Sequence, residues 1–300
     1  MQYRELGRTG QRLSLVGFGG ILVVGEEQAE ADRLVAAAVA RGVNYFDVAP
    51  AYGDGEAEEK LGPALQTHRA GAFLACKTRE RDAAGARADL ERSLRRLRTD
   101  HFDLYQLHGL SEMADVERVL GPGGALEVLR RAREEGKARF LGFSAHSPAA
   151  ALRLLGAFPF DSVLFPLNFA AYQAGFGPQV VEAAQQAGAG LLALKAMALT
   201  GLPEGTTLEQ RPWRKAWYEP IAEPGTAELA LRFTLSLPVT AAITPGYWEF
   251  FERALRVAED PRALSAEEAE RLRELAARTV PLFPPAPGKA GPRPPSRILA

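Results

Sequence analysis

Polar residues of complementary chemistry lie at the ends of three consecutive strand-like segments. Asp47 and Tyr52 occur in FDVAPAYGDGEAEEKLG, residues 46–62, which has the pattern of a buried strand, a turn and the start of a helix. Lys77 lies near the end of FLACKT, and His108 near the end of FDLYQLHG. The intervals from Asp47 to Lys77 and from Lys77 to His108 are 30 and 31 residues. Each interval fits one strand, helix and loop, which predicts that these side chains meet at equivalent ends of successive parallel strands.

A tyrosine beside a lysine indicates acid–base chemistry. A nearby ammonium favours the phenolate, so we expect Lys77 to lower the pKa of Tyr52 from the usual value of about 10. Tyr52 is then a candidate general acid, and Asp47 is the partner that keeps Lys77 charged and fixed. His108 is a candidate hydrogen-bonding group for a substrate oxygen.

The same residues have other interpretations. Asp47 and Lys77 could form a structural ion pair, His108 could be a core histidine, and Tyr52 could be an amphipathic turn residue. A second enzymatic hypothesis makes Asp47, His108 and His146 the ligands of a catalytic metal in a barrel hydrolase. The sequence has no H-x-H motif or second carboxylate to complete that ligand set. The common placement of four residues favours the acid–base site.

Strand-like and helix-like segments alternate eight times along the chain. This alternation fits a closed barrel or an open doubly wound sheet, and no G-x-G-x-x-G motif follows the first strand. We therefore predict an eight-stranded parallel (β/α)8 TIM barrel. The predicted strands are Leu13–Phe18, the segment ending at Asp47, Phe73–Thr78, Phe102–His108, Arg139–Ser144, Ser162–Asn168, Gly190–Ala196 and Ala241–Thr244. The predicted helices are Gly25–Arg41, Ala57–Leu65, Ala83–Arg98, Gly124–Glu135, Pro148–Leu155, Pro178–Gln186, Thr226–Leu235 and Trp248–Val257.

Additional segments flank this barrel. The first twelve residues suit a β-hairpin that closes one end, and Ala266–Arg278 should be an extra helix packed outside. We expect residues 1–280 to form a single barrel domain. Residues 281–300 contain seven prolines and should form an extended C-terminal tail.

Composition and charge narrow the function classes. The net charge of −1 and the pI near 6.5 give no basic face for nucleic acid. The start of the chain lacks a signal-peptide core, and no apolar run approaches a membrane span, so we expect a cytoplasmic protein without membrane contacts. The single cysteine, Cys76, lies in a strand-like run and is expected to be a buried structural thiol. The oligomeric state cannot be predicted from these features.

Several motifs resemble those of the aldo-keto reductase family. They are D-x-A-x-x-Y-G at Asp47–Gly53, the lysine in ACKT, the histidine in LYQLHG and the opening YRELGRTG followed by GFGG. The similarity extends from Tyr3 to about Arg278, and the segments FSAHS, LFPLN and ALKAMA suggest a less-studied branch. The resemblance implies that Tyr52 is the proton donor and Lys77 its pKa modulator, with Asp47 holding Lys77 and His108 orienting the carbonyl. It also implies a small carbonyl substrate and NADPH, with NADH as the alternative, lying across the barrel mouth without a Rossmann fold.

The cofactor contacts depart from the family pattern. Ser144 matches the first residue of the family's Ser-Asn pair, but Ala145 follows it, and Leu164 or Phe165 occupies the place of a glutamine that holds the carboxamide. Lys195 ends the seventh predicted strand, where barrel phosphate sites often lie, although a surface lysine would have the same pattern. The predicted cofactor contacts are Gly19 and Gly20 after the first strand, Ser144, Asn168, Lys195, Gly246 in a PG loop, and Arg253 as the candidate for the adenosine 2′-phosphate.

A long segment, Leu199–Gly225, separates the seventh strand from its helix, and we expect it to be a loop that acts as a lid or a specificity element. The sequence thus predicts reduction of an aldehyde or ketone by hydride transfer, with Tyr52 protonating the oxygen. The alternative is a cofactor-binding, redox-sensing module that turns over negligibly. Turnover of a generic aldehyde would distinguish the two, because a sensor should bind cofactor without consuming it.

Overall fold

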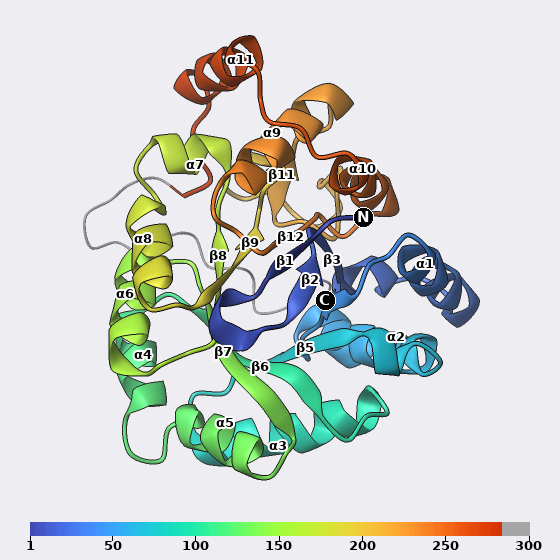
Figure 1. Cartoon of the computed structure of the whole chain (residues 1–300), viewed down its shortest axis with the longest axis vertical. Helices are drawn as coiled ribbons and strands as arrows, with labels where there is room; N and C mark the ends of the chain where they lie inside the picture. The colour runs from blue at the N-terminus through green and yellow to red at the C-terminus, as the bar shows by residue number, and fades with distance from the viewer. Residues whose placement is uncertain (284–300) are drawn as a thin grey trace.

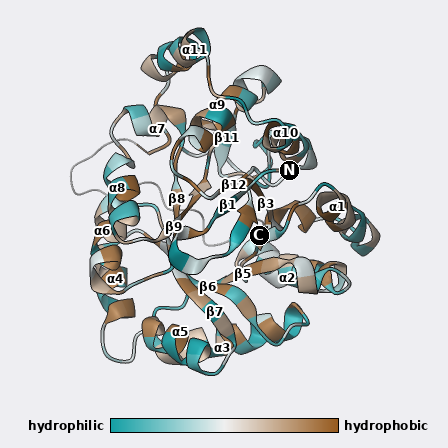
Figure 2. Ribbon diagram, viewed as in Figure 1, coloured by the Kyte–Doolittle hydropathy of each residue, from teal (hydrophilic) through white to brown (hydrophobic). Residues whose placement is uncertain are grey.

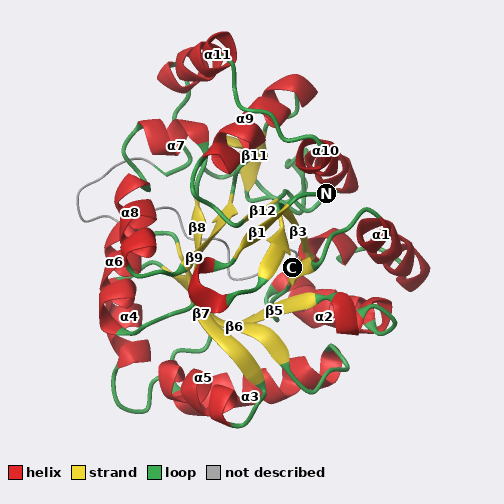
Figure 3. Ribbon diagram, viewed as in Figure 1, coloured by secondary structure: helices red, strands yellow, loops and turns green. Residues whose placement is uncertain are grey.

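Eight parallel strands close into a barrel in the computed structural model, which describes residues 1–283 of the chain (Figures 1 and 3). The order around the barrel is β12-β3-β4-β5-β6-β7-β8-β9, so each strand pairs with the next in sequence and the last returns to the first. The (β/α)8 barrel predicted from the alternation is therefore confirmed. The barrel strands are β3 (Val16–Gly19), β4 (Tyr45–Asp47), β5 (Phe73–Thr78), β6 (Phe102–Leu110), β7 (Ala138–Ala145), β8 (Ser162–Pro166), β9 (Gly190–Leu194) and β12 (Ala241–Ile243).

Helices surround the barrel and bury their apolar faces against it (Figure 1). Hydrophilic residues, drawn in teal in Figure 2, lie on the outside of the helices. The extra helix predicted near the C-terminal end is confirmed as α11, which contacts α7 and α9. The helices are α1 (Gln28–Ala40), α2 (Glu56–Leu65), α3 (Ala83–Arg96), α4 (Met113–Leu120), α5 (Ala125–Glu134), α6 (Pro148–Ala157), α7 (Phe169–Gln173), α8 (Pro178–Gln186), α9 (Pro224–Ser236), α10 (Trp248–Glu259) and α11 (Ala266–Ala277).

The N-terminal hairpin closes the end of the barrel at which the strands begin. It consists of β1 (Tyr3–Glu5) and β2 (Arg12–Ser14), paired antiparallel. Leu6 and Leu13 are fully buried and belong to the apolar cluster that fills the barrel interior. The single strand predicted over Leu13–Phe18 is wrong, because it divides into β2 and β3. The Ser14 hydroxyl donates a hydrogen bond to the Val16 carbonyl at 2.9 Å where the chain leaves the hairpin for the barrel.

Some short elements were not predicted from the sequence. These are α4, α7 and the antiparallel pair β10 (Ala198–Gly201) and β11 (Tyr218–Pro220), which lies within the segment expected to be a loop. In the described part of the chain, no helix is both long and apolar enough to cross a bilayer. Most of the predicted C-terminal tail, residues 284–300, lies outside the described residues.

Candidate active site

Strict alternation along the barrel strands selects which side chains enter the lumen. Phe73 and Ala75 of β5 belong to the interior cluster, whereas Leu74 and Cys76 belong to the layer between barrel and helices. The next inward position on β5 is Lys77. By the same alternation Tyr45 and Asp47 face inward on β4, and Leu104, Gln106 and His108 do so on β6. Asp47 pairs with Ala75 and Lys77 with Gln106, so the polar side chains occupy successive inward positions near the carboxyl ends of the strands.

Asp47 and Lys77 form a buried ion pair at this level. Lys77 is 0% exposed and Asp47 2%, and the Lys77 ammonium donates to Asp47 Oδ1 and to the Val48 carbonyl, the latter at 3.2 Å. The other carboxylate oxygen accepts hydrogen bonds from the Tyr45 hydroxyl at 3.1 Å and from the Gln106 amide at 3.4 Å. Burial disfavours the ammonium, but Asp47, together with the neighbouring Tyr52, offsets this effect and raises the pKa of Lys77 above its ordinary value.

Tyr52 and His108 lie next to this pair and are partly exposed, unlike Asp47 and Lys77. Their rings meet edge to face with centroids 5.9 Å apart, and the Lys77 ammonium lies 5.3 Å from the centre of the Tyr52 ring. The structure thus brings together all four residues that the sequence predicted to converge. The arrangement offers a phenol and an imidazole to a molecule entering the mouth, with a fixed positive charge beside the phenol.

The pKa of Tyr52 differs from the sequence-based expectation. Burial raises it above the ordinary value of a phenol, and Lys77, which lowers it, only partly offsets that effect. The expectation that Lys77 would give a net lowering is therefore wrong for this state of the protein. Tyr52 carries its proton at neutral pH, which is the form that a general acid requires.

His108 is held in its neutral form. Burial first, and then the charges of Lys77 and Arg79, keep its pKa well below the usual range. Its Nδ1 is buried and has no hydrogen-bond partner within the described residues. A neutral imidazole can offer one N–H to an incoming oxygen without adding charge.

Four of the residues predicted to contact a cofactor lie at or just after the carboxyl ends of β7, β8, β9 and β12; they are Ser144, Asn168, Lys195 and Gly246. The Ser144 hydroxyl accepts the Gly109 N–H at 2.7 Å and retains its own proton for donation. Asn168 is fully buried; its Oδ1 caps α7 by accepting the Ala171 N–H at 2.8 Å, while its Nδ2 has no partner within residues 1–283. A buried amide donor without an acceptor fits a carboxamide oxygen, so the site is chemically suited to a nicotinamide.

Lys195 follows β9 in a left-handed backbone conformation with φ 68°. Its ammonium lies 4.2 Å from the ring centre of Tyr218 and 4.9 Å from that of Trp217. Burial lowers its pKa to about 7, although the two ring faces favour the charged form. In the described part of the chain the contacts of this ammonium are these two aromatic rings and no carboxylate, so an anion could still bind to it.

The remaining predicted cofactor contacts have structural roles as well. A side chain at Gly20 would lie 2.8 Å from Val48 Cγ2, and one at Gly246 would lie 2.7 Å from Ile21 Cγ2. A side chain at Gly19 would likewise lie 3.2 Å from Ile243 Cγ2. Packing between neighbouring loops therefore already accounts for these glycines. Arg253 lies on α10, over the Phe250 ring and 3.9 Å from a Glu249 oxygen, with 16% of its side chain exposed.

The segment after β9 is tethered to two other loops at the mouth. The Lys215 ammonium pairs with Glu26 at 3.0 Å and donates to the Leu22 carbonyl at 3.2 Å, both in the loop after β3. Its backbone N–H donates to the Tyr247 hydroxyl at 2.8 Å. This strap joins the segment after β9 to the loops that follow β12 and β3, the next two strands around the barrel.

The metal hypothesis is not supported by the geometry. Within residues 1–283, no three histidine, cysteine or carboxylate side chains are grouped in a way that could hold a metal ion. Asp47 is occupied by Lys77, and His146 packs on the rings of Phe283 at 5.7 Å and Trp217 at 6.3 Å.

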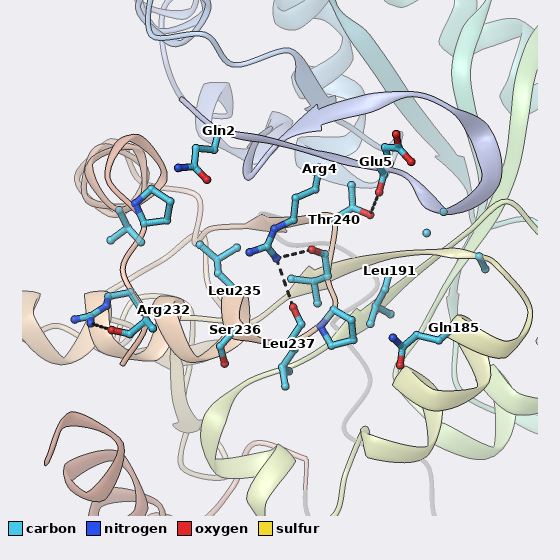
Figure 4. Close-up of a pocket in the computed structure, with 18 of the residues that line it drawn as sticks. Gln2, Arg4, Glu5, Gln185, Leu191, Arg232, Leu235, Ser236, Leu237 and Thr240 are labelled. Atoms are coloured by element: carbon cyan, nitrogen blue, oxygen red, sulfur yellow. Dashed lines mark hydrogen bonds between the residues drawn. The ribbon is translucent and has the colours of Figure 1, made fainter. Parts of the chain in front are cut away.

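A separate groove of about 1280 Å³ lies where the strands begin, at the end of the barrel opposite the four acid–base residues (Figure 4). There Arg4 donates to the Val239 carbonyl at 2.8 Å, and the Thr240 hydroxyl donates to the Glu5 carbonyl at 2.9 Å. These contacts fasten the hairpin to the barrel. The groove contains none of the acid–base residues, so we assign the chemistry to the mouth.

Sequence reasoning missed two residues of the site. Tyr45 and Gln106 support the Asp47 carboxylate and lie two positions before Asp47 and His108 respectively. The alternation of strand side chains would have found both, because residues two apart face the same side.

A closed (β/α)8 barrel with acid–base side chains at the carboxyl ends of its strands is the architecture of a barrel enzyme. A sequence model of the Aldo/keto reductase family matches residues 16–278. Aldo-keto reductase YhdN of Bacillus subtilis is 31% identical over 164 residues, which cover 49% of this chain and 48% of that protein. L-galactose dehydrogenase of Arabidopsis thaliana is 30% identical over 157 residues, 48% of each chain. The matches therefore span about half the length of these relatives.

Solved structures agree over more of the chain. Aldo-keto reductase AKR11C1 from Bacillus halodurans, in its holo form, has a TM-score of 0.70 at 24% identity, covering 92% of this chain and 96% of that one. The glycerol dehydrogenase AKR11B4 from Gluconobacter oxydans gives 0.70 at 23% identity, covering 96% and 98%. At these identities the likeness shows the fold. The chain belongs to the aldo/keto reductase family. The family generally uses NAD(P)H and acts on small carbonyl compounds.

Proposed function

We propose that this protein reduces a small aldehyde or ketone to the alcohol, with Tyr52 as the general acid. The observation that carries the proposal is the contact of the Tyr52 and His108 rings above a buried Lys77–Asp47 pair. When bound, the nicotinamide cofactor supplies the hydride to the carbonyl carbon. Tyr52 gives its proton to the carbonyl oxygen, so the substrate gains one hydride and one proton overall.

His108 and Lys77 have separate roles beside Tyr52. The neutral His108 offers an N–H to the carbonyl oxygen and orients it toward Tyr52. Lys77 stabilises the phenolate that Tyr52 becomes, because its ammonium is fixed 5.3 Å from the ring centre and is held in its charged form by Asp47. Catalysis then rests on a charge already in place before the proton moves.

We further propose NADPH as the preferred cofactor. Support comes from the unpaired Asn168 amide for the carboxamide and from two cations, Lys195 and Arg253, for phosphates. Trp217 adjoins Lys195, so cofactor binding should quench tryptophan fluorescence. Titration with NADPH and with NADH tests this preference, and equal affinity for both would remove it.

The decisive variant is Tyr52→Phe, which keeps the ring and its packing and deletes only the hydroxyl. Cofactor affinity should stay near that of the wild type, while the rate of reduction should fall at least about 100-fold, the lower end of what a positioned general acid contributes. Single-turnover oxidation of bound NADPH by a reactive aldehyde measures that rate without product release.

Two outcomes would contradict the proposal. A Tyr52→Phe protein that reduces the aldehyde at the wild-type rate would show that the proton comes from elsewhere. A wild-type protein that binds NADPH but oxidises it with none of a panel of aldehydes and ketones would favour the redox-sensing alternative.

A further inference from the structure

The turn that carries Tyr52 has an unusual backbone. Gly53, Asp54 and Gly55 have φ values of 62°, 57° and 101°, so three consecutive residues lie in the left-handed region. One of them, Asp54, has a side chain that disfavours this conformation. Such a backbone persists only where the surrounding structure fixes it.

The loop after β3 fixes one side of this turn. A side chain at Gly53 would lie 2.8 Å from Val24 Cγ1, and the Gly25 N–H donates to the Glu56 carboxylate at 3.0 Å. These contacts hold the beginning of the turn and the first residue of α2.

Arg96, the last residue of α3, fixes the other side. A Cβ atom at Gly55 would lie 2.5 Å from Arg96 Cζ, so the guanidinium packs directly on the backbone of the turn. The backbone of Arg96 also contacts α2, because a Cβ at Gly62 would lie 2.5 Å from the Arg96 carbonyl oxygen. One residue of α3 thus contacts the segment 55–62 at both ends.

Two carboxylates of α2 hold the Arg96 guanidinium in place. It lies 3.4 Å from the fully buried Glu58 and 3.2 Å from the exposed Glu59. The second oxygen of Glu58 lies 3.6 Å from the Cys76 sulfur, in the strand position next to Lys77. Glu58 therefore connects the helix that follows Tyr52 to the strand that carries Lys77.

We propose that Arg96, fixed by Glu58, is a positioning residue that holds the phenol of Tyr52 in register with Lys77. Arg96 lies between α2 and α3, outside the barrel lumen, so it acts through the turn and not by touching the substrate. The role of Tyr52 as general acid is taken from the proposed function. A lysine cannot replace this arginine fully, because the planar guanidinium bonds two carboxylates while lying flat on the turn.

The kinetic test uses Arg96→Met, which keeps the aliphatic stem and removes the guanidinium. Its single-turnover rate should fall about 10- to 100-fold, the scale of a displaced reacting group, while KM stays within about twofold. Arg96→Lys should recover part of the rate. The matched control is Arg87→Met, in the same helix, where the arginine pairs with Glu91 and Glu135 on the surface; its rate should remain at the wild-type level.

A double variant separates positioning from general destabilisation. In a Tyr52→Phe background, Arg96→Met should cause little further loss, because its effect passes through the deleted hydroxyl. A full additional loss there, or a wild-type rate in Arg96→Met alone, would overturn the inference. If Arg96→Met does not fold, Glu58→Gln keeps the shape of the carboxylate partner and should give a rate loss of the same kind.

A second measurement requires no turnover. Amide hydrogen exchange over residues 52–62 should be about tenfold faster in Arg96→Met than in either the wild type or Arg87→Met, because the turn opens locally more often. If the wild type reduces no aldehyde, the proposed function fails while this comparison still decides the role of Arg96. Equal exchange in all three proteins would refute it.

Discussion

Replacing Lys77 with methionine should weaken the fold as well as stop the reaction. The change leaves the Asp47 carboxylate in place, 2% exposed, without its counter-charge. Removing one partner of a buried ion pair typically costs about 3–5 kcal/mol. Asp47 keeps the hydrogen bonds from Tyr45 at 3.1 Å and from Gln106 at 3.4 Å, so we expect a loss near the lower end, about 3 kcal/mol of the free energy of unfolding.

Urea unfolding at neutral pH measures this loss, and a second substitution identifies its cause. Lys77→Met combined with Asp47→Asn removes the stranded charge, so it should return to within about 1 kcal/mol of the wild-type stability. The double variant should remain inactive, because Tyr52 still lacks its neighbouring cation.

Two results would refute this reasoning. One is a Lys77→Met protein as stable as the wild type within about 0.5 kcal/mol, which would mean that the pair is already screened or hydrated. The other is a double variant no more stable than the single one, which would place the loss in packing instead of charge.

Three further predictions concern the mouth. Lys195→Met should weaken NADPH binding by about 1–3 kcal/mol, as for one charge-assisted hydrogen bond. Because the pKa of Lys195 is about 7, the affinity of the wild-type protein for NADPH should fall as the pH rises above 7, and the variant should lack this dependence. Lys215→Met should speed NADPH dissociation about 2- to 5-fold in stopped flow, because it cuts the partly exposed ion pair with Glu26, and Glu26→Gln should match it. His146 has a pKa of about 3 in the folded protein and about 6.5 in the unfolded chain, so the unfolded chain binds more protons between these values and His146 lowers the free energy of unfolding as the pH falls through that window. His146→Gln should therefore remove up to about 1.4 kcal/mol per pH unit of this dependence, as measured by urea unfolding between pH 6 and 4.

The barrel and its four central residues could be predicted because they depend on local regularities. Strand and helix segments have distinct periods, and polar residues at intervals of 30 and 31 match one structural unit each. Residue types and spacing therefore located Asp47, Lys77 and His108 before any coordinates.

Other features depend on contacts between distant segments. The strands β10 and β11 pair across 16 intervening residues, Leu202–Trp217, and with four and three residues each is too short for its pattern to identify a strand. The helix α7 has only five residues, and its Asn168 cap is recognisable only once β8 is known to end at Pro166. The raised pKa of Tyr52 could not be predicted, because it follows from the loss of water around the phenol, which outweighs the nearby charge of Lys77.

The hairpin covers the end of the barrel at which the strands begin, which leaves the mouth at their carboxyl ends as the route by which solvent would reach the site. Leu6 and Leu13 are fully buried and pack in the same apolar cluster as Tyr45, below the Asp47–Lys77 pair. A ligand lying across that mouth would then cut the buried charges off from bulk solvent. If Tyr52 is the proton donor proposed above, its proton would have to be loaded before the mouth is covered, and its replacement would wait until the mouth reopens. Each catalytic cycle would thus begin with the proton already on Tyr52. The two buried leucines of the hairpin would impose this order, because they close the other end of the barrel.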